Sequence, residues 1–132
     1  MRYRISRSAI AAVPVLAILS AGAGAAMAAM AAIAGTTWQS EGTATLKVEA
    51  DGSVSGSTGC NRYSGSAELG NGMTIRFGPL ATTRMACKGP RMEEEQAFIA
   101  ALENARSYGF EAGNLVLLDG SGAVVATFTL GQ

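Results

Sequence analysis

The stretch GCNRYSG (residues 59–65) sets a cysteine and an asparagine between glycines, with an arginine and a tyrosine directly behind them. A second cysteine follows in TRMAC (83–87), and the chain has two cysteines in all. How Cys60 and Cys87 are used therefore decides both the fold and the functional class of the protein.

Three uses of these cysteines are open. As a nucleophile, Cys60 needs a base or a helix amino terminus that populates its thiolate, and the chain has no histidine. A tetrahedral metal site built on two thiols needs carboxylates or a second subunit to complete it. A disulfide needs only the two sulfurs, and small exported domains often contain one. We therefore expect a Cys60–Cys87 disulfide, with no catalytic residue, no cofactor and no metal ion.

An export signal is predicted at the amino terminus. The first seven residues carry three arginines, and no charged residue then occurs before Glu41. An apolar centre at 9–19 precedes small residues with several Ala-x-Ala cleavage sites, as in a secretory signal peptide. We expect residues 1–34 to be this signal and residues 35–132 to be one domain, in the periplasm or outside the cell. The alternative is an uncleaved leader that anchors the protein in the membrane, since the charge-free run is long enough to span a bilayer.

The remaining composition excludes several functional classes. Three of the ten basic residues lie in the leader, so residues 35–132 keep seven basic and ten acidic groups, a net charge of −3. Such a domain is a poor match for nucleic acid. The absence of histidine removes the commonest general base and transition-metal ligand. These features favour a binding domain over an enzyme.

Beyond the leader, the sequence predicts short strands joined by glycine turns. Three segments alternate apolar and polar residues, as half-buried antiparallel strands do; they are TATLKVEA (43–50), residues 63–69 and MTIRF (73–77). Asp51-Gly52 predicts a two-residue hairpin into SVSGS (53–57). Three more strands are expected at SYGFE (107–111), LVLLD (115–119) and VVATFTL (124–130). GPLATTRMACKG (78–89) has no period and is predicted to be a loop.

One helix is predicted to begin near Pro90. Proline suits a first helical turn, and Glu93–Glu95 complement the positive end of the helix dipole. Phe98, Ile99 and Leu102 form an apolar stripe. We interpret the three glutamates as a solvated helix start and not as a catalytic cluster. One helix cannot cover a flat sheet of about seven strands, so the predicted fold is α+β, a curved, partly open antiparallel β-barrel around a single helix.

The residues beside the cysteines form a candidate binding site. Gly59 and Asn61 suit backbone positions with positive φ. If the disulfide forms, Arg62 and Arg84 come close together, where they either hold an anion or pair with Glu68 or the helix carboxylates. The candidate binding residues are Asn61, Arg62, Tyr63, Thr83, Arg84 and Met85.

Four segments together resemble the META domain, as in HslJ-like heat-shock-inducible bacterial proteins: VSGSTGCNRYSGSAEL, IRFGPLATTRMAC, the EEEQAFIAAL helix and LVLLDGSGAVVATF. The resemblance spans about 43–130. It implies a curved, partly open barrel around one helix, similar to pilotin-type lipoproteins of secretion systems. It also implies an envelope or stress-associated role with no established enzymatic activity.

The chain departs from the family pattern before its first alternating strand. Family members have a longer segment after an early tryptophan, whereas QSEG alone separates Trp38 from Thr43. We therefore expect the first, barrel-closing strand to be shortened or lost.

Three functions are compatible with these features. The first is an exported non-enzymatic domain with an envelope or stress-response role, which binds a small apolar ligand in the barrel or an envelope protein along a sheet edge. The second is a secreted inhibitor of a hydrolase, such as a lysozyme or a protease, which inserts Arg84 or Met85 of the 81–89 loop. The third is a thiol redox protein that uses Cys60 and Cys87. The first is preferred, because a stapled β scaffold carries no assembled catalytic set.

Overall fold

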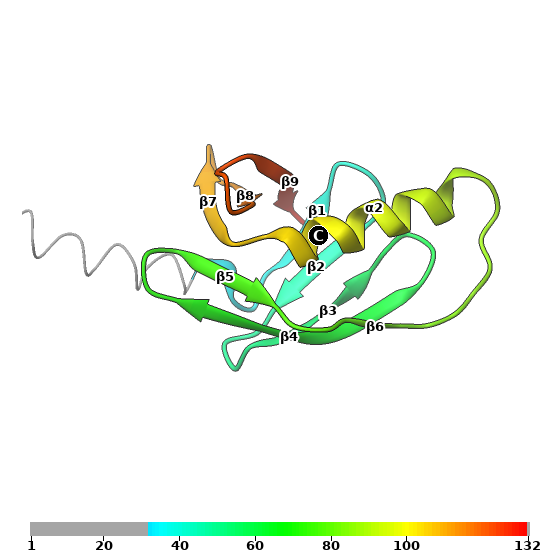
Figure 1. Cartoon of the computed structure of the whole chain (residues 1–132), viewed down its shortest axis with the longest axis horizontal. Coiled ribbons are helices and arrows are strands. Elements are labelled where there is room, and N and C mark those ends of the chain that lie inside the picture. The colour runs from blue at the N-terminus through cyan, green and yellow to red at the C-terminus, as the bar shows by residue number, and fades with distance from the viewer. Residues whose placement is uncertain (1–31, 132) are drawn as a thin grey trace, which may run out of the picture.

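The computed structural model describes residues 32–131, so nearly all of the predicted signal peptide lies outside the described residues. Within them the chain forms nine strands and one long helix (Figure 1). The elements are β1 (Thr37–Ser40), β2 (Thr45–Val48), β3 (Ser53–Ser57), β4 (Arg62–Gly70), β5 (Thr74–Phe77), β6 (Ala81–Thr82), α2 (Pro90–Asn104), β7 (Ser107–Glu111), β8 (Asn114–Leu118) and β9 (Val124–Leu130). Over this range no helix combines the length and the apolar character that crossing a bilayer requires.

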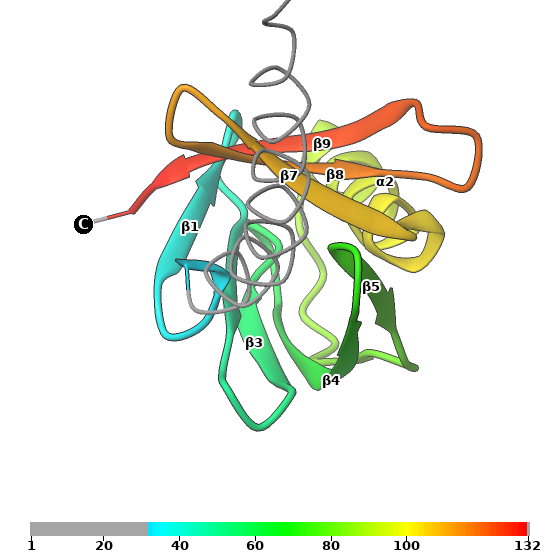
Figure 2. The ribbon, with the colours of Figure 1, turned by 90° about the vertical axis from the view of Figure 1, so that its left-hand side faces the viewer.

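The nine strands form one antiparallel sheet whose hydrogen bonds run in a ring. The strand order is β3-β2-β1-β9-β8-β7-β5-β4-β6, and β3 also pairs with β4. The ring is uneven, since β7 and β8 pair along their whole length whereas β5 and β7 meet at a single pair, Thr74 and Ser107. Figure 2 shows β7, β8 and β9 crossing above β1, β3, β4 and β5. The prediction of an α+β, curved and partly open barrel is confirmed, with two strands more than the seven expected.

The first of the two unexpected strands is β1, which contains Trp38. It pairs with β2 on one side and with β9 on the other, so the closing strand is not lost, although it is short at four residues. The segment after Trp38 is short because it forms a tight turn. The Ser40 hydroxyl accepts the N–H groups of Gly42 and Ala44, which brings the chain directly back as β2.

The turn from β2 to β3 is longer than the predicted two residues. The Gly52 N–H donates to the Glu49 carbonyl at 3.0 Å, and Gly52 has a φ of 93°. This is a three-residue turn that needs a left-handed residue at its end, which glycine adopts without steric cost. The turn from β8 to β9 repeats it, because the Gly122 N–H donates to the Asp119 carbonyl at 3.0 Å.

The interior of the ring is filled with side chains. The predicted inward residues of β2, β3 and β5 are buried, among them Leu46, Val54 and Ile75. Aromatic rings from separate elements meet across the centre, for example Phe98 of α2 and Phe128 of β9, whose ring centroids are 6.1 Å apart. The helix packs against β5 and β9 along one side. In residues 32–131 the core is therefore packed with side chains.

The predicted apolar stripe of α2 is confirmed. Leu102 is fully buried, and Phe98 and Ile99 are half-buried against the core. The opposite face of the helix is exposed to solvent. The helix therefore covers the open side of the ring with one face.

Candidate functional site

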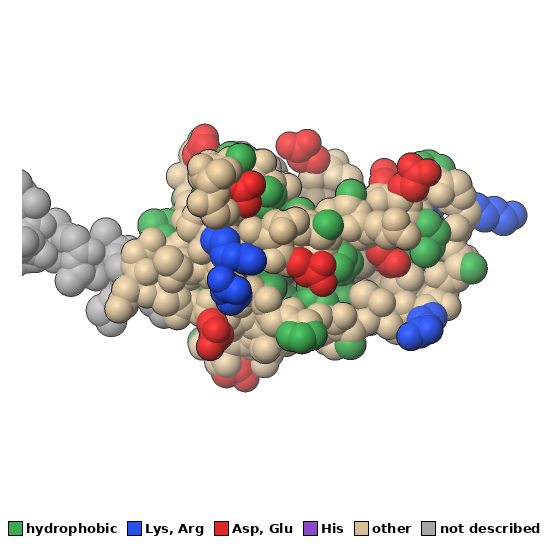
Figure 3. Space-filling view, in the orientation of Figure 1, with side chains coloured by type: hydrophobic (Ala, Val, Ile, Leu, Met, Phe, Trp, Pro, Cys, Tyr) green, Lys and Arg blue, Asp and Glu red, His purple; other side chains and the backbone are tan. Residues whose placement is uncertain are grey.

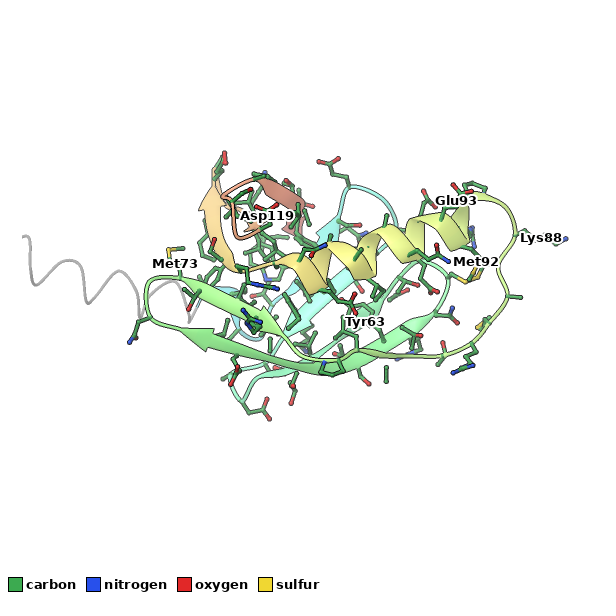
Figure 4. The ribbon with its side chains drawn as sticks, viewed as in Figure 1. Tyr63, Met73, Lys88, Met92, Glu93 and Asp119 are labelled. Atoms are coloured by element: carbon green, nitrogen blue, oxygen red, sulfur yellow. A yellow bond between two sulfur atoms is a disulfide. The ribbon has the colours of Figure 1, made fainter. Side chains whose placement is uncertain are left out.

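Cys60 and Cys87 form a disulfide, as predicted. Their Cα atoms are 5.9 Å apart, in the usual range for such a bond. Cys60 lies in the turn between β3 and β4, and Cys87 lies just before α2. The bond therefore joins this turn to the segment that leads from β6 to the helix. Met92 of α2 packs beside it, with its sulfur 3.9 Å from the Cys60 sulfur (Figure 4).

Asn61 is the centre of the hydrogen bonds around the disulfide. Its side chain is almost fully buried, at 3% exposure. Its Oδ1 accepts the Met85 N–H at 2.7 Å and the Thr83 hydroxyl at 2.8 Å, and its Nδ2 donates to the Met85 carbonyl at 3.3 Å. Because one amide pairs with both backbone groups of Met85, it acts as a further strand residue. Asn61 thus extends the β4–β6 pairing beyond the end of β6.

The same amide reaches the helix. Nδ2 of Asn61 donates to Oε1 of Glu95 at 2.9 Å, and the Thr58 hydroxyl lies 2.6 Å from the same oxygen. Glu95 is 9% exposed, so the interpretation of all three glutamates as solvated is wrong for this one. The sequence held a signal for this burial, since Glu95, Phe98 and Leu102 follow the spacing of one helix face.

Thr58 closes the turn that holds Cys60. Its N–H donates to the Asn61 carbonyl at 2.7 Å, and its hydroxyl oxygen accepts the Asn61 N–H at 2.8 Å. Gly59 has a φ of 94°, and a side chain there would collide with Thr43. The prediction of positive φ is confirmed for Gly59 and wrong for Asn61, whose φ is not positive. An asparagine is therefore required at position 61 for its side-chain hydrogen bonds and not for a left-handed backbone conformation.

Tyr63 lies in the core. Its ring meets Phe98 edge-on at 5.7 Å, and its hydroxyl donates to the Thr45 carbonyl at 2.6 Å. Gly56 makes this possible, because a Cβ at that position would collide with both the Tyr63 hydroxyl and the Thr45 carbonyl. Burial raises the pKa of Tyr63 well above its usual range. Tyr63 therefore stabilises the sheet beneath the site, and its role as a binding residue stays a prediction.

The other candidate residues lie on the surface. Arg62, Thr83 and Arg84 are exposed, and Met85 is 62% exposed. Among residues 32–131, one ion pair is present, between Lys47 and Glu49 at 3.4 Å. In this part of the chain, Arg62 and Arg84 therefore do not form the alternative ion pairs with Glu68 or the helix carboxylates. Anion binding by these arginines stays a prediction.

A groove of about 740 Å³ is lined by residues of β2, β3 and β4 and by Ala81, Thr82 and Thr83 of this segment. Its walls carry hydroxyl side chains and the cations of Lys47 and Arg62. In the described part of the chain, no three acidic or cysteine side chains converge on one point, so we assign no metal site.

The site holds the backbone in place, and we call the Cys60–Cys87 disulfide and the side-chain bonds of Asn61 together the clamp. Both sulfurs are joined to each other, and the Glu95 oxygen is held by Thr58 and Asn61. These groups fix the segment after β6 from two directions, by a covalent bond at Cys87 and by hydrogen bonds at Thr83 and Met85. The segment is therefore exposed, and its backbone is restrained at Met85 and Cys87.

Comparison with known proteins agrees with this architecture. The sequence model of the META domain matches residues 28–132, so the chain belongs to the META domain family. No curated protein matches the chain significantly.

Solved structures share the fold. An NMR structure of a protein from Burkholderia xenovorans is 27% identical, with a TM-score of 0.62 over 80% of this chain and 88% of that one. A second NMR structure is 21% identical, with a TM-score of 0.59 over 76% and 93%. A crystal structure of a DUF4847 family protein from Bacteroides vulgatus is 22% identical, with a TM-score of 0.52 over 65% and 57%. The last two show the fold alone.

Proposed function

We propose that this META domain protein is an exported, non-enzymatic binding domain of the cell envelope, which contacts a protein partner through the exposed segment 81–87. The observation that carries the proposal is the clamp. A disulfide and a buried amide fix a segment whose side chains from Ala81 to Ala86 are all exposed. Rigid, exposed segments bind with a smaller loss of conformational entropy than flexible ones do.

Two further observations support parts of this proposal. A disulfide persists in oxidising compartments outside the cytoplasm, which fits an exported protein with a leader of the secretory pattern. The core is filled by side chains such as Phe98 and Phe128, which favours a protein partner over the small apolar ligand that we also considered. A role in envelope stress rests on the resemblance to HslJ-like proteins and belongs to the proposal.

Site-specific photocrosslinking in growing cells tests this function. A photoreactive residue replaces Met85, and the matched control carries it at Val124, which is similarly exposed at 53% but lies in β9. We expect a discrete crosslinked product at Met85 in the envelope fraction, without one at Val124. The proposal fails if Met85 yields no product above the control, or if the protein stays in the cytoplasm with its leader attached.

A hydrolase inhibitor is the second candidate. It is favoured by the exposure of Arg84 and Met85 within a segment that is fixed at both ends, as insertion into an active site requires. Purified protein is incubated with lysozymes and serine proteases, alongside the Arg84→Ala variant. Inhibition that this substitution weakens would support the candidate, and no inhibition at micromolar protein would remove it.

The third candidate, a thiol redox protein, has only the half-buried disulfide itself in its favour. The reduction potential of the Cys60–Cys87 disulfide tests this candidate, since structural disulfides are far harder to reduce than those of redox enzymes. A potential well below that of glutathione would end this candidate.

A further inference from the structure

We propose that the backbone of residues 82–86, which we name the free edge, receives an extended acidic segment of a partner protein as an additional β-strand. This inference rests on the proposed function, because it presumes a protein partner. It adds the conformation of the bound segment, its chemical class and the groups that bind it.

The direction of the backbone groups follows from the bonds on the inner side of the segment. Thr83 donates its N–H to the Arg62 carbonyl at 3.0 Å, and both backbone groups of Met85 pair with the Asn61 amide. In an extended chain, successive residues direct their backbone groups to opposite edges. The N–H and C=O groups of Thr82, Arg84 and Ala86 therefore point away from β4.

No other strand occupies that side. β6 is the terminal strand in the sheet order, and it pairs with β4 alone. Among the backbone bonds that residues 32–131 make outside helices and strands, none comes from the N–H groups of Arg84 and Ala86. Such an unpaired row of donors and acceptors is a template for strand addition. The bonds at Thr83 and Met85 and the disulfide at Cys87 restrain this row before any partner arrives.

The charge of the region selects an acidic partner. Residues 79–92 contain Arg84, Lys88 and Arg91 and no acidic residue, although residues 35–132 as a whole are acidic. Figure 3 shows Lys and Arg side chains at this end of the molecule, with Asp and Glu side chains also present there, and Lys88 projects outward in Figure 4. Glu93 lies on the side of α2 away from β6 (Figure 4). A cationic edge in an acidic domain steers an acidic segment toward itself.

Charge also argues against a second copy of this chain as the occupant. Antiparallel pairing of two free edges about a twofold axis at Arg84 would place the Arg84 side chains of the two copies opposite each other, without a carboxylate from this segment. Like charges so close to one another are unfavourable. An acidic segment removes this repulsion and supplies the counter-charge.

Amide hydrogen exchange of the oxidised, ¹⁵N-labelled protein tests the inference. The probes are two eight-residue peptides with blocked ends, one alternating Glu and Val and the other alternating Lys and Val. With the Glu/Val peptide we expect exchange at Thr82, Arg84 and Ala86 to slow, while the amides of Thr83 and Met85 are already protected and stay so. The Glu/Val peptide should bind about tenfold more tightly than the Lys/Val peptide at low salt.

Two variants separate backbone pairing from charge. Arg84→Pro removes one outward N–H and leaves the bonds of Thr83 and Met85 in place, so it should abolish protection by either peptide. Arg84→Ala keeps that N–H and removes the charge, so it should weaken Glu/Val binding several-fold and preserve the alternating pattern. Protection of Met85 in the peptide-free variants shows that the clamp is intact. If Arg84→Pro disturbs it, Thr82→Pro tests the same edge.

Three results would overturn the inference. Unchanged exchange at Thr82, Arg84 and Ala86 with millimolar Glu/Val peptide would exclude strand addition, and equal binding of both peptides would exclude an acidic partner. A concentration-dependent dimer that protects the same amides would assign the edge to a second copy. A crosslinked partner at Met85 without peptide protection would leave the proposed function standing and remove only the free edge as its contact.

Discussion

Replacement of Asn61 by alanine is the sharpest test of the clamp. The change removes the bond to the buried carboxyl group of Glu95, whose remaining partner is then Thr58. It also removes two bonds to the backbone of Met85 and one to the Thr83 hydroxyl. The Thr83 and Met85 groups that lose their partner lie on the surface segment and can bond to water. The Glu95 oxygen that loses its partner is buried.

The structure sets the size of the effect. A buried hydrogen bond to a carboxyl group contributes about 2 kcal/mol, and each bond to an exposed group contributes ~0.5 kcal/mol. We therefore expect Asn61→Ala to lower the free energy of unfolding by about 3.5 kcal/mol. The assay is urea unfolding of the oxidised protein at neutral pH. The matched control is Asn71→Ala, at an exposed turn residue, which should change stability by less than ~0.5 kcal/mol.

A double-mutant cycle with Glu95→Ala assigns the energy to its source. Because the two side chains share one buried bond, their substitutions should couple by about 1–2 kcal/mol. A loss of unfolding free energy below ~1 kcal/mol for Asn61→Ala would refute the reasoning, because removing a buried amide that bonds to four groups should destabilise the fold by more than that. Additive effects of the two substitutions would refute the role assigned to Glu95.

Three other predictions concern the sheet, the disulfide and one turn. Tyr63→Phe should destabilise the protein by about 1 kcal/mol in thermal unfolding, because it removes a hydrogen bond to the Thr45 carbonyl. Tyr108→Phe should cost ~0 kcal/mol, because the Tyr108 hydroxyl is buried without a partner among the described residues. Equal effects of the two substitutions would contradict this reasoning. Reduction and alkylation of Cys60 and Cys87 should lower the free energy of unfolding by roughly 3–4 kcal/mol in urea; unchanged stability would show that the bond does not restrain the fold. Hydrogen bonds from Ser121 and Ala123 lower the pKa of Asp119, so this carboxylate stabilises the fold above its usual pKa near ~4 and the contribution is lost as the pH falls through the lowered value. The free energy of unfolding should therefore decrease less on acidification in Asp119→Asn than in the wild type, and parallel pH profiles would exclude the effect.

The fold could be predicted where the local pattern decided the structure. The alternation in β2, β4 and β5 and the stripe of α2 each depend on one face being apolar, which the sequence shows directly. β1 and β6 were not predicted, since each is held by pairing with strands distant in the chain, as Trp38 is by Leu46 and Leu130. Register between distant segments is not a local property.

Only part of the site could be predicted, because most of its contacts join residues that lie far apart in the sequence. The disulfide followed from an even cysteine count, because two thiols can pair in only one way. The role of Asn61 depends on Met85 and Glu95, which lie 24 and 34 residues away. Gly59 and the tolerance of asparagine for positive φ suggested a turn residue, and only the three-dimensional contacts show that the amide serves as part of a strand. Glu95 was misinterpreted because two exposed glutamates precede it.

The state of the two sulfurs in the protein taken from its own cells tests the central claim most directly. The protein is denatured in an alkylating reagent, with and without prior reduction, and its intact mass is measured. We expect no adduct without reduction and two adducts after it, on a chain shortened by removal of the leader. Two adducts without reduction would show that Cys60 and Cys87 are free thiols, and the clamp would no longer account for the exposed segment.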